Sequence, residues 1–538
     1  MRESARMNSP TWLRRLPGLP LYPLLAAGYP VIYLYAQNVQ EAIPPAEIFV
    51  PLAICVGAAL MVMGIVGAIT RAWAAAGLAS TLLVVLFFTY GMAWDWLGTM
   101  LLGQWVLLAA WLLVAVIGLF FIWRFHPVAD RITVPLNVIT GLALLINLVT
   151  IGTFVFNVRP TAASTGSGVT ASGEGPTPAN LRDVYWVILE EYGSGSVLRE
   201  HFDYDNEPFL DALRERGFYI AEDSTANYLK TAPAIQAARN LDYLDGPALR
   251  EQAKAPDDWG PIYRGLRSEF EVQKFLDGLG YRFIYAGTFW TPMGRHPLAE
   301  INYVYDKLAS EFLDVLQRAT MLRAFEDLGT DPPYDWRRNR YNQTLYQLRS
   351  LRRASDLAGP KFIHTQLALN HEPYVFHPDG SFITAEEQRQ MTHEEAYVEQ
   401  LRYTNAQMLE WMDQLLDVPP DERPIIMLLG DEGPWTPEYR RNERGYDWRT
   451  ASPERLKLKF GIINAVYLPD QDPEEAGFYR SISLVNQFRV LFNAEFGLDL
   501  PLLPDRNFIW PDQSDIYTYI DVTDKVKADA EGGLTPPP

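Results

Sequence analysis

The sequence contains almost no cysteine. Its one thiol, Cys55, lies within an apolar stretch in the first third of the chain. A single cysteine excludes an intramolecular disulfide and a cysteine-based metal site, so any metal chemistry must come from other side chains. Because there is no cysteine pair to assess, cysteine usage gives no indication of the redox compartment.

Lysine is absent from residues 1–160, and that region holds only eight arginines and five acidic residues. Subtracting these from the totals of 46 basic and 65 acidic residues leaves 38 basic and 60 acidic residues in the remainder, a net charge of −22. The chain therefore has an apolar first part and an acidic second part. An acidic domain lacks the lysine and arginine that neutralise phosphates, which excludes nucleic acid as an expected partner.

Long apolar stretches fill the first part of the chain. At 538 residues the chain is too long for one core, and we predict a transmembrane region with five helices over residues 1–156. Each stretch has about the 20 residues that cross a bilayer. The predicted spans are 17–37, 46–70, 73–94, 99–122 and 132–156. Four prolines in the first span predict a kink, and the several further spans argue against a signal peptide.

Basic residues near the spans indicate the orientation. With a cytoplasmic N-terminus, the cytoplasmic segments carry seven arginines. The external loops at 38–45 and 95–98 then carry Glu41 and Asp95 and no basic residue. This asymmetry follows the positive-inside rule. Five crossings would place everything after residue 156 outside the cytoplasm.

The remainder divides into a linker, a folded domain and a tail. Residues 157–182 are rich in Gly, Ser and Pro, which predicts a flexible linker, and residues 527–538 are predicted to be a disordered tail. Between them, residues 183–526 alternate strand-like and helix-like segments, the sign of an α/β fold. The predicted strands are 184–189, 218–221, 281–285, 361–369, 424–429 and 460–467. The predicted helices are 206–216, 231–244, 307–327, 336–354, 393–416 and 483–496.

Two of the strands end in paired carboxylates. The first strand runs into Glu190 and Glu191. Strand 424–429 runs through a glycine into Asp431 and Glu432. Both runs are apolar throughout, as in strands buried on both faces of a largely parallel sheet. Because the carboxyl ends of such strands meet where sites open, the sequence predicts a site of hard oxygen ligands suited to a metal ion.

A threonine lies at a predicted helix start. Thr231 stands at the N-cap position, with Pro233 in the first turn and a helix to about Leu244. One interpretation is a capping threonine and nothing more. The other is a nucleophile, because a helix N-terminus attracts anionic groups and a nearby metal can lower the pKa of a hydroxyl.

Together these features resemble the alkaline phosphatase/sulfatase superfamily, specifically its membrane-bound lipoteichoic acid synthase-like and phosphoethanolamine transferase-like branch. The resemblance lies in a first strand that ends in Glu190, in Thr231 41 residues further on, and in the flanking segments Asn227-Tyr228 and 240–244. It covers nearly the whole chain. It implies a five-helix region in a bacterial cell membrane, followed by an extracytoplasmic sulfatase-like α/β domain with a largely parallel central sheet.

One position departs from the resemblance. The late strand of the family usually ends Asp-His-Gly, whereas this chain reads Asp431-Glu432-Gly-Pro. A carboxylate can replace imidazole as a ligand, and it favours Mg²⁺ or Mn²⁺ over Zn²⁺. The resemblance therefore implies one divalent metal held by Glu190, Thr231, Asp431 and Glu432.

The resemblance also indicates residues that would meet the substrate. The segment 361–374 resembles the family stretch that brings a histidine to the substrate phosphate, and His371 is the match by position. His364 lies inside the apolar strand and is expected to be a satisfied core histidine. The loop 287–292 also looks like a family loop, so Trp290 either lines the pocket or packs in the ordinary way.

The implied activity is the metal-dependent transfer of a phospho-headgroup, phosphoglycerol- or phosphoethanolamine-like. Thr231 would attack the phosphorus of a membrane phospholipid with the help of His371, and the resulting phospho-threonine would pass the group to an envelope glycan or lipid. Two alternatives stay open: a phosphodiesterase or sulfatase-like hydrolase with the same site, and a non-catalytic domain that binds glycan or protein. A sulfatase is less favoured because a threonine cannot become formylglycine. The sequence does not indicate the oligomeric state.

Overall fold

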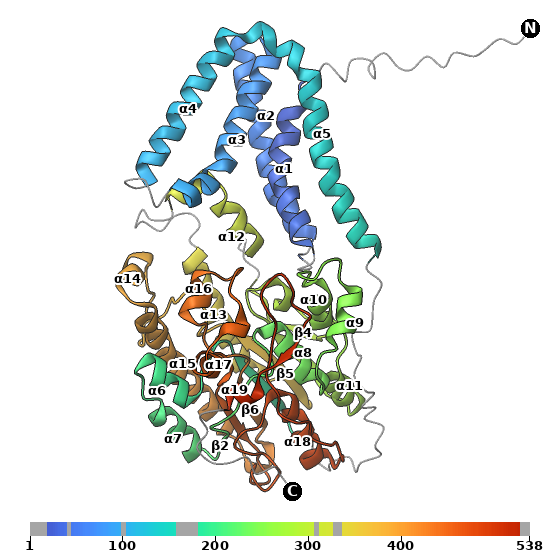
Figure 1. Ribbon diagram of the computed structural model, residues 1–538, viewed down its shortest axis with the longest axis vertical. Helices are drawn as coiled ribbons and strands as arrows, with labels where there is room; N and C mark the ends of the chain where they lie inside the picture. Colours follow the sequence, from blue (N-terminus) through green and yellow to red (C-terminus); the bar gives the residue numbers. More distant parts are fainter. Residues whose placement is uncertain are drawn as a thin grey trace, which may run out of the picture. The chain divides into compact units, whose positions relative to one another are not determined.

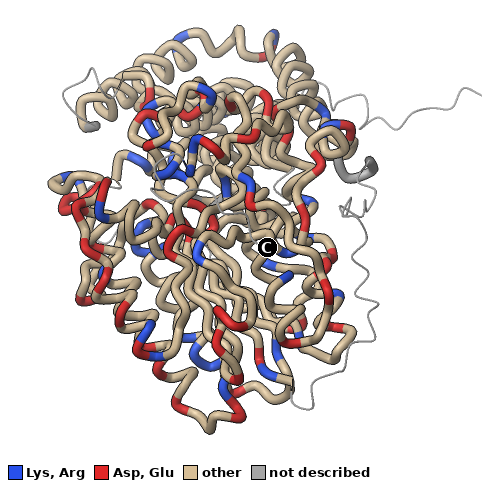
Figure 2. Tube along the Cα trace, turned by 60° about the horizontal axis from the view of Figure 1, so that its bottom comes forward, with Lys and Arg blue, Asp and Glu red and all other residues tan. Residues whose placement is uncertain are grey.

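The computed structural model describes residues 19–39, 43, 45–97, 104–157, 181–305, 311–325 and 336–527. The predicted linker 157–182 and tail 527–538 lie almost entirely outside these residues. The chain forms two compact units, one of residues 1–160 with 307–335 and the other of residues 161–306 with 336–538. Charged side chains are sparse on the helices of the first unit and dense on the second (Figure 2).

The first unit is built on apolar helices (Figure 1). Their bounds are α1 Tyr22–Gln37, α2 Phe49–Thr70, α3 Trp73–Leu97, α4 Gln104–Arg124 and α5 His126–Asn157, with a short 3-10 turn, η3 Pro45–Ile48, before α2. Within the described residues, four helices are long and apolar enough to cross a membrane, from α2 to α5. The first unit is therefore a membrane anchor.

Helix α1 is the exception among the predicted spans. It has 16 residues and contains Pro30, so it is about 24 Å long, against about 30 Å of bilayer hydrocarbon. Asn137 of α5 accepts hydrogen bonds from the N–H groups of Leu21 and Tyr22 at 3.0 and 2.8 Å, which fixes the start of α1. Passage of α1 through the membrane, and with it the count of five spans and the topology, stays a prediction.

A segment from much later in the chain also belongs to the first unit. It consists of α12 Glu311–Arg318 and the 3-10 turn η5 Met321–Phe325. Phe312 and Leu316 are buried in one cluster with Tyr35 of α1, and the N–H of Gly91 donates to the carbonyl of Ala319 at 3.1 Å. Within the region 307–327, predicted as one helix of the soluble domain, the described residues therefore form two short elements that pack on helices of the first unit.

The second unit has a seven-stranded central sheet. Its strands are β1 Val184–Leu189, β2 Tyr219–Ile220, β3 Arg282–Ala286, β4 Ile301–Asn302, β5 Lys361–Leu367, β6 Ile425–Gly430 and β7 Asn464–Tyr467, in the order β2-β7-β6-β1-β5-β3-β4. The five strands β1, β3, β4, β5 and β6 are parallel, while β7 is antiparallel to β6 and β2 to β7. A separate pair joins β8 Phe508–Ile509 and β9 Ile520–Asp521. The predicted, largely parallel sheet is confirmed.

Helices cover both faces of this sheet (Figure 1). Alternate residues of β1 enter opposite cores, with Trp186 in one and Val187 in the other, and every residue of the strand is buried. The first core also receives α8 Thr231–Asn240 and α18 Leu484–Phe496; the second receives α15 His393–Leu416.

The other helices of the second unit are shorter, apart from α13. Their bounds are α6 Gly195–Phe202, α7 Glu207–Glu215, α9 Gly246–Gln252, α10 Gly260–Arg267, α11 Glu271–Gly278, α13 Trp336–Ala354, α14 Ala385–Gln390, α16 Pro437–Arg441, α17 Pro453–Phe460 and α19 Thr523–Val526. Three 3-10 turns complete the unit: η4 Thr291–Met293, η6 Pro420–Glu422 and η7 Trp448–Thr450. The strand predicted over 460–467 begins only at Asn464, because α17 runs through Phe460.

Candidate active site

The two carboxylate pairs lie side by side at one edge of the sheet. Strands β1 and β6 are neighbours, and Leu189 is paired with Gly430. Glu190 and Asp431, the residues that follow, therefore leave adjacent strands at the same level. A side chain at Gly430 would meet the Tyr192 carbonyl oxygen at 2.7 Å, so glycine lets the chain after β1 pass close to β6.

Asp431 is the centre of the arrangement. Its Oδ1 accepts hydrogen bonds from the N–H groups of Glu191 at 3.2 Å and Glu432 at 2.9 Å, and its Oδ2 accepts one from Gln366 Nε2 at 3.2 Å. The Thr231 hydroxyl lies near the same carboxylate and lowers its pKa. Asp431 is fully buried, and burial raises the pKa of its carboxyl despite these bonds.

Thr231 is the first residue of α8 and not its cap. Lys230, in extended conformation, takes the N-cap position and makes no side-chain capping bond. The predicted N-cap assignment is therefore shifted by one residue. Since the threonine side chain is not used as a cap, its hydroxyl is directed to Asp431 at the N-terminal, electropositive end of the helix.

Glu190 is the second fully enclosed carboxylate of the site. Its backbone N–H continues the sheet by donating to the Leu367 carbonyl at 3.0 Å, and its side chain lies near the Gln366 amide, which lowers its pKa. Burial, with Asp431 nearby, raises the pKa of the Glu190 carboxyl to about 7. A carboxyl group with this pKa changes charge in the neutral range.

Glu191 and His371 form a pair beside these carboxylates. His371 Nε2 lies 3.5 Å from Glu191 Oε1, and its Nδ1 lies 2.5 Å from the carbonyl of Glu372, to which the N–H donates. Burial lowers the pKa of His371, but the carboxylates of Glu191 and Glu190 outweigh it, so the pKa ends above its ordinary value. The structure thus brings His371 to the predicted site.

Glu432 is turned toward a lysine that the sequence analysis missed. Lys459 Nζ lies 3.2 Å from Glu432 Oε2, and the lysine side chain is fully buried. Lys459 is on α17, and a side chain at Gly433 would strike the Leu458 carbonyl of that helix, so glycine permits the close approach. The only sequence signal was Glu432 itself, because a buried carboxylate calls for a cationic partner.

The three predicted carboxylates do not surround one point. Among the described residues, no group of three or more His, Cys, Asp or Glu side chains is placed to hold a metal ion. Glu191 and Glu432 each face a cationic partner, whereas Glu190 and Asp431 form no ion pair with Lys or Arg in the part of the chain that the structure describes. Two buried carboxylates and a hydroxyl are hard oxygen donors, and they fit a divalent cation.

The remaining sequence candidates lie further out. Trp290 is half-buried against Tyr263, with ring centroids 5.2 Å apart, and Tyr263 stacks on Trp259, above which the Lys230 ammonium lies at 5.5 Å. The rings of Tyr263 and Trp259 therefore lie between Trp290 and Lys230, the residue that precedes Thr231. His364 is fully buried against Trp186, with ring centroids 4.2 Å apart, which confirms its core position. Neither of its ring nitrogens has a hydrogen-bond partner within the described residues, so the prediction of a satisfied histidine is wrong.

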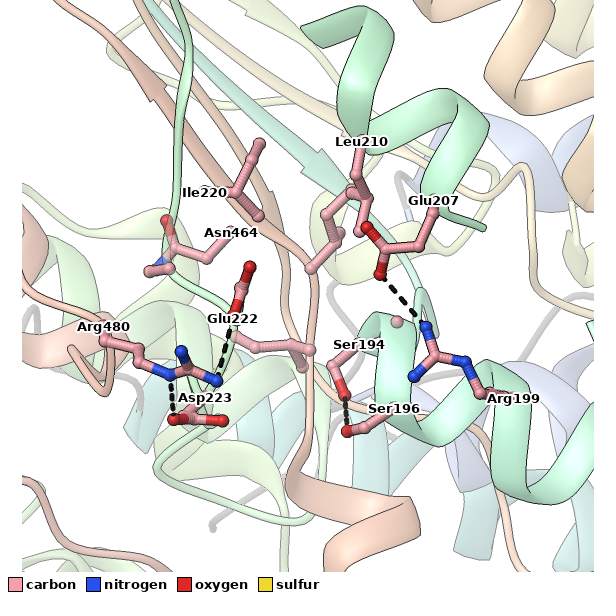
Figure 3. A pocket seen from close by; sticks show the side chains of 14 residues that line it. Ser194, Ser196, Arg199, Glu207, Leu210, Ile220, Glu222, Asp223, Asn464 and Arg480 are labelled. Atoms are coloured by element: carbon pink, nitrogen blue, oxygen red, sulfur yellow. Dashed lines mark hydrogen bonds and ion pairs between the residues drawn. The ribbon is translucent and has the colours of Figure 1, made fainter. Parts of the chain in front are cut away.

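A small cavity lies between α6, α7 and β7 (Figure 3). Figure 3 shows arginines on opposite sides of it: Arg199 pairs with Glu207, and Arg480 with Glu222 and Asp223. Since acidic partners already neutralise both arginines, the cavity offers no uncompensated positive charge to an anion. None of its lining residues belongs to the carboxylate site.

No protein-family model and no curated protein sequence matches this chain. Solved structures do resemble it. The C-terminal periplasmic domain of EcEptC from Escherichia coli, in complex with Zn, is 11% identical, covers 65% of this chain and 94% of its own length, and has a TM-score of 0.40.

Two further solved structures are similar at the same level. The integral membrane lipooligosaccharide phosphoethanolamine transferase A (EptA) from Neisseria meningitidis is 11% identical, with 89% of this chain and 96% of that chain covered and a TM-score of 0.39. The lipoteichoic acid synthase LtaP from Listeria monocytogenes is 13% identical, with 63% and 80% covered and a TM-score of 0.36. The solved structures similar to this chain thus include phosphoethanolamine transferases and a lipoteichoic acid synthase.

Proposed function

We propose that this chain is a membrane-anchored enzyme that transfers a phospho-headgroup from a membrane phospholipid through Thr231. One observation carries the proposal: the Thr231 hydroxyl, at the start of α8, lies beside the fully buried Asp431 carboxylate at the edge of the sheet and lowers its pKa. A hydroxyl directed away from helix capping and toward a potential proton acceptor is arranged as a nucleophile.

In the first half-reaction, the Thr231 Oγ–P bond forms and the P–O bond to the lipid alcohol breaks. The hydroxyl proton passes to the Asp431 carboxylate, which lies beside the Thr231 hydroxyl. The departing lipid oxygen takes a proton from His371, whose pKa is raised by the carboxylates of Glu191 and Glu190. The products are a phospho-threonine and diacylglycerol.

In the second half-reaction an acceptor hydroxyl attacks the phosphorus of the phospho-threonine. The acceptor gives its proton to the now neutral His371, and the Thr231 oxygen recovers its proton from Asp431. The N-terminus of α8 faces negative charge on the phosphoryl group throughout. We propose an envelope glycan or lipid as the acceptor.

The donor set also suits a metal. Glu190, Asp431 and Thr231 would hold one divalent cation, which would lower the pKa of the hydroxyl and withdraw charge from the phosphoryl oxygens. Because these donors are all oxygens, we propose Mg²⁺ or Mn²⁺ in preference to Zn²⁺. The membrane helices α2–α5 support a lipid donor, since they keep the enzyme at the surface where that donor lies.

One observation favours a second candidate, a domain that binds glycan or protein without catalysis. Glu432 is engaged by Lys459 and leaves fewer than three predicted carboxylates for a metal. A domain of this kind would bind its partner without forming phospho-threonine. The two candidates therefore differ in a covalent product.

The test uses the purified full-length protein in lipid nanodiscs with a phospholipid labelled in its headgroup. The wild type should acquire the label on the peptide that contains Thr231 and release diacylglycerol, and adding a glycan acceptor should separate transfer from hydrolysis. Thr231→Ala should lose both signals, whereas Thr518→Ala, which removes a surface hydroxyl bonded to Asp515, should keep them. Undiminished diacylglycerol release by Thr231→Ala would end the proposal.

A further inference from the structure

Lys459 holds the Glu432 carboxylate through a complete set of contacts. Its Nζ lies 3.2 Å from Glu432 Oε2, donates to the Gly433 carbonyl at 2.7 Å and lies 3.2 Å from the centroid of the Trp435 ring. The Gly433 carbonyl accepts a hydrogen bond from this ammonium, whereas the contact with Glu432 is an ion pair whose Oε2 has no hydrogen-bond partner in the described part of the chain. The Gly433 N–H in turn donates to the Lys459 carbonyl at 2.8 Å, so the lysine is fixed at backbone and side chain.

This pairing makes Glu432 a counter-ion. Both side chains are buried, with exposures of 0% for Lys459 and 3% for Glu432. Turning the carboxylate toward a metal would leave the ammonium unpaired in a region without solvent, which is strongly unfavourable. The pair is also electroneutral, so it adds no net charge to the site.

Gln366 reaches Glu190 and Asp431, the two carboxylates of the site that form no ion pair with Lys or Arg among the described residues. It lies on β5, opposite Ile188 of β1, and is fully buried. Its Nε2 donates to Asp431 Oδ2 at 3.2 Å, and its amide also lies near Glu190, whose pKa it lowers. Because carboxylates only accept, the NH₂ group is the end of the amide that faces them.

The other end of this amide is unsatisfied. Gln366 Oε1 is buried and has no hydrogen-bond partner. A buried acceptor without a donor is costly and rare. The last torsion of a glutamine is soft and roughly two-fold, so half a turn of the amide brings Oε1 to the place where the NH₂ group now meets Glu190 and Asp431. An oxygen there is favourable only if a cation replaces the hydrogen-bond donor.

We propose that Gln366 Oε1 is a ligand of the divalent cation, together with Glu190, Asp431 and Thr231, and that Glu432 is held out of the ligand set by Lys459. The ligand set is then two carboxylates, one amide and one hydroxyl. Only two of these four ligands, Glu190 and Asp431, are His, Cys, Asp or Glu residues. A set of this kind is compatible with the finding that no three such residues are placed to hold a metal ion among the described residues. The inference rests on the metal of the proposed function.

The test measures Mn²⁺ binding by electron paramagnetic resonance of the free ion, on full-length protein stripped of metal with a chelator. Removal of outer-shell partners alone weakens metal affinity by about 10–100-fold, so Gln366→Leu should raise the Kd at least about tenfold. Gln366→Glu restores an oxygen and should bind within about threefold of the wild type. The double variant E432Q/K459M, which removes the ion pair at similar volume, should also bind within about threefold.

The opposite pattern would overturn the proposal: Gln366→Leu binding as tightly as the wild type, or E432Q/K459M losing Mn²⁺ while Gln366→Leu keeps it. Thermal unfolding of each metal-free variant shows whether it is folded. A variant that is folded but gains no stability on Mn²⁺ addition has lost the site and not the fold. A wild type that binds no Mn²⁺ also rejects the proposal, while labelling of Thr231 reports separately on the transferase.

Discussion

The fully buried lysine of the site gives a sharp test of stability. Lys459→Met keeps most of the apolar stem but removes the ammonium that faces Glu432 at 3.2 Å and Gly433 at 2.7 Å. Removing one partner of a buried ion pair costs about 3–5 kcal/mol. For a folded unit of several hundred residues, each kcal/mol lowers Tm by roughly 2 °C. We therefore expect this variant to melt roughly 6–10 °C below the wild type at pH 8.

The deficit should depend on pH in a defined direction. Burial raises the pKa of Glu432 well above its ordinary value even with Lys459 present, and loss of the lysine raises it further. A carboxyl whose pKa is higher in the folded state than in the unfolded state contributes most to stability at low pH, below its unfolded pKa. This contribution is lost as the pH rises through the folded-state pKa. The Tm deficit of Lys459→Met should therefore be small near pH 5 and grow toward pH 8.

Two controls separate the charge effect from packing. Lys457 lies two residues earlier on α17 and pairs with Glu200 at the surface, so Lys457→Met should cost less than about 1 kcal/mol. The E432Q/K459M variant removes both charges and should recover most of the loss. The assay is thermal unfolding of the metal-free full-length protein in detergent. If Lys459→Met melts within about 2 °C of Lys457→Met at pH 8, the buried pair does not have the stability role given to it here.

Two further predictions concern the second buried carboxylate and the late segment of the first unit. Burial raises the pKa of Glu190 to about 7, so by the same linkage the metal-free protein should lose stability as the pH rises from about 5 through 7. The Tm measured across this range should fall without metal and stay constant with excess Mn²⁺. A flat profile for the metal-free protein would contradict the raised pKa of Glu190. A side chain at Gly91 would strike the carbonyl of Arg318, so Gly91→Leu should displace α12 and η5 and speed trypsin cleavage after Arg318 or Arg323. Gly57→Leu, on a helix face with open space, is the matched control, and equal cleavage of the two variants would show that the segment is not held as described.

The main strands could be predicted because their information is local. The apolar run of β1 predicts a strand buried on both faces, and the strand has the predicted bounds, Val184–Leu189. The long helices α13 and α15 also have their predicted bounds. Paired carboxylates after two such strands predicted the meeting of Glu190 with Asp431, because parallel strands deliver their carboxyl ends to one edge.

Other parts of the site depend on contacts that no local pattern reports. Lys459 lies in the run Leu456-Lys-Leu-Lys-Phe460, whose alternation favours a strand, yet Ser452 caps a helix there through the Arg455 N–H. Gln366 follows a histidine and a threonine inside a buried strand, and only the paired register shows which carboxylates it reaches. The placement of α12 in the first unit likewise follows from tertiary packing, because its own sequence is that of an ordinary amphipathic helix.

The late segment of the first unit changes how the two units are tied together. The chain passes between them at three places, after residue 160, before residue 307 and after residue 335. Phe312, Leu316 and Ala324 are buried in the first unit. In a soluble fragment that begins after residue 160 they would be exposed apolar side chains that favour aggregation. Replacing residues 307–335 by a short loop should therefore give a more soluble fragment of the second unit.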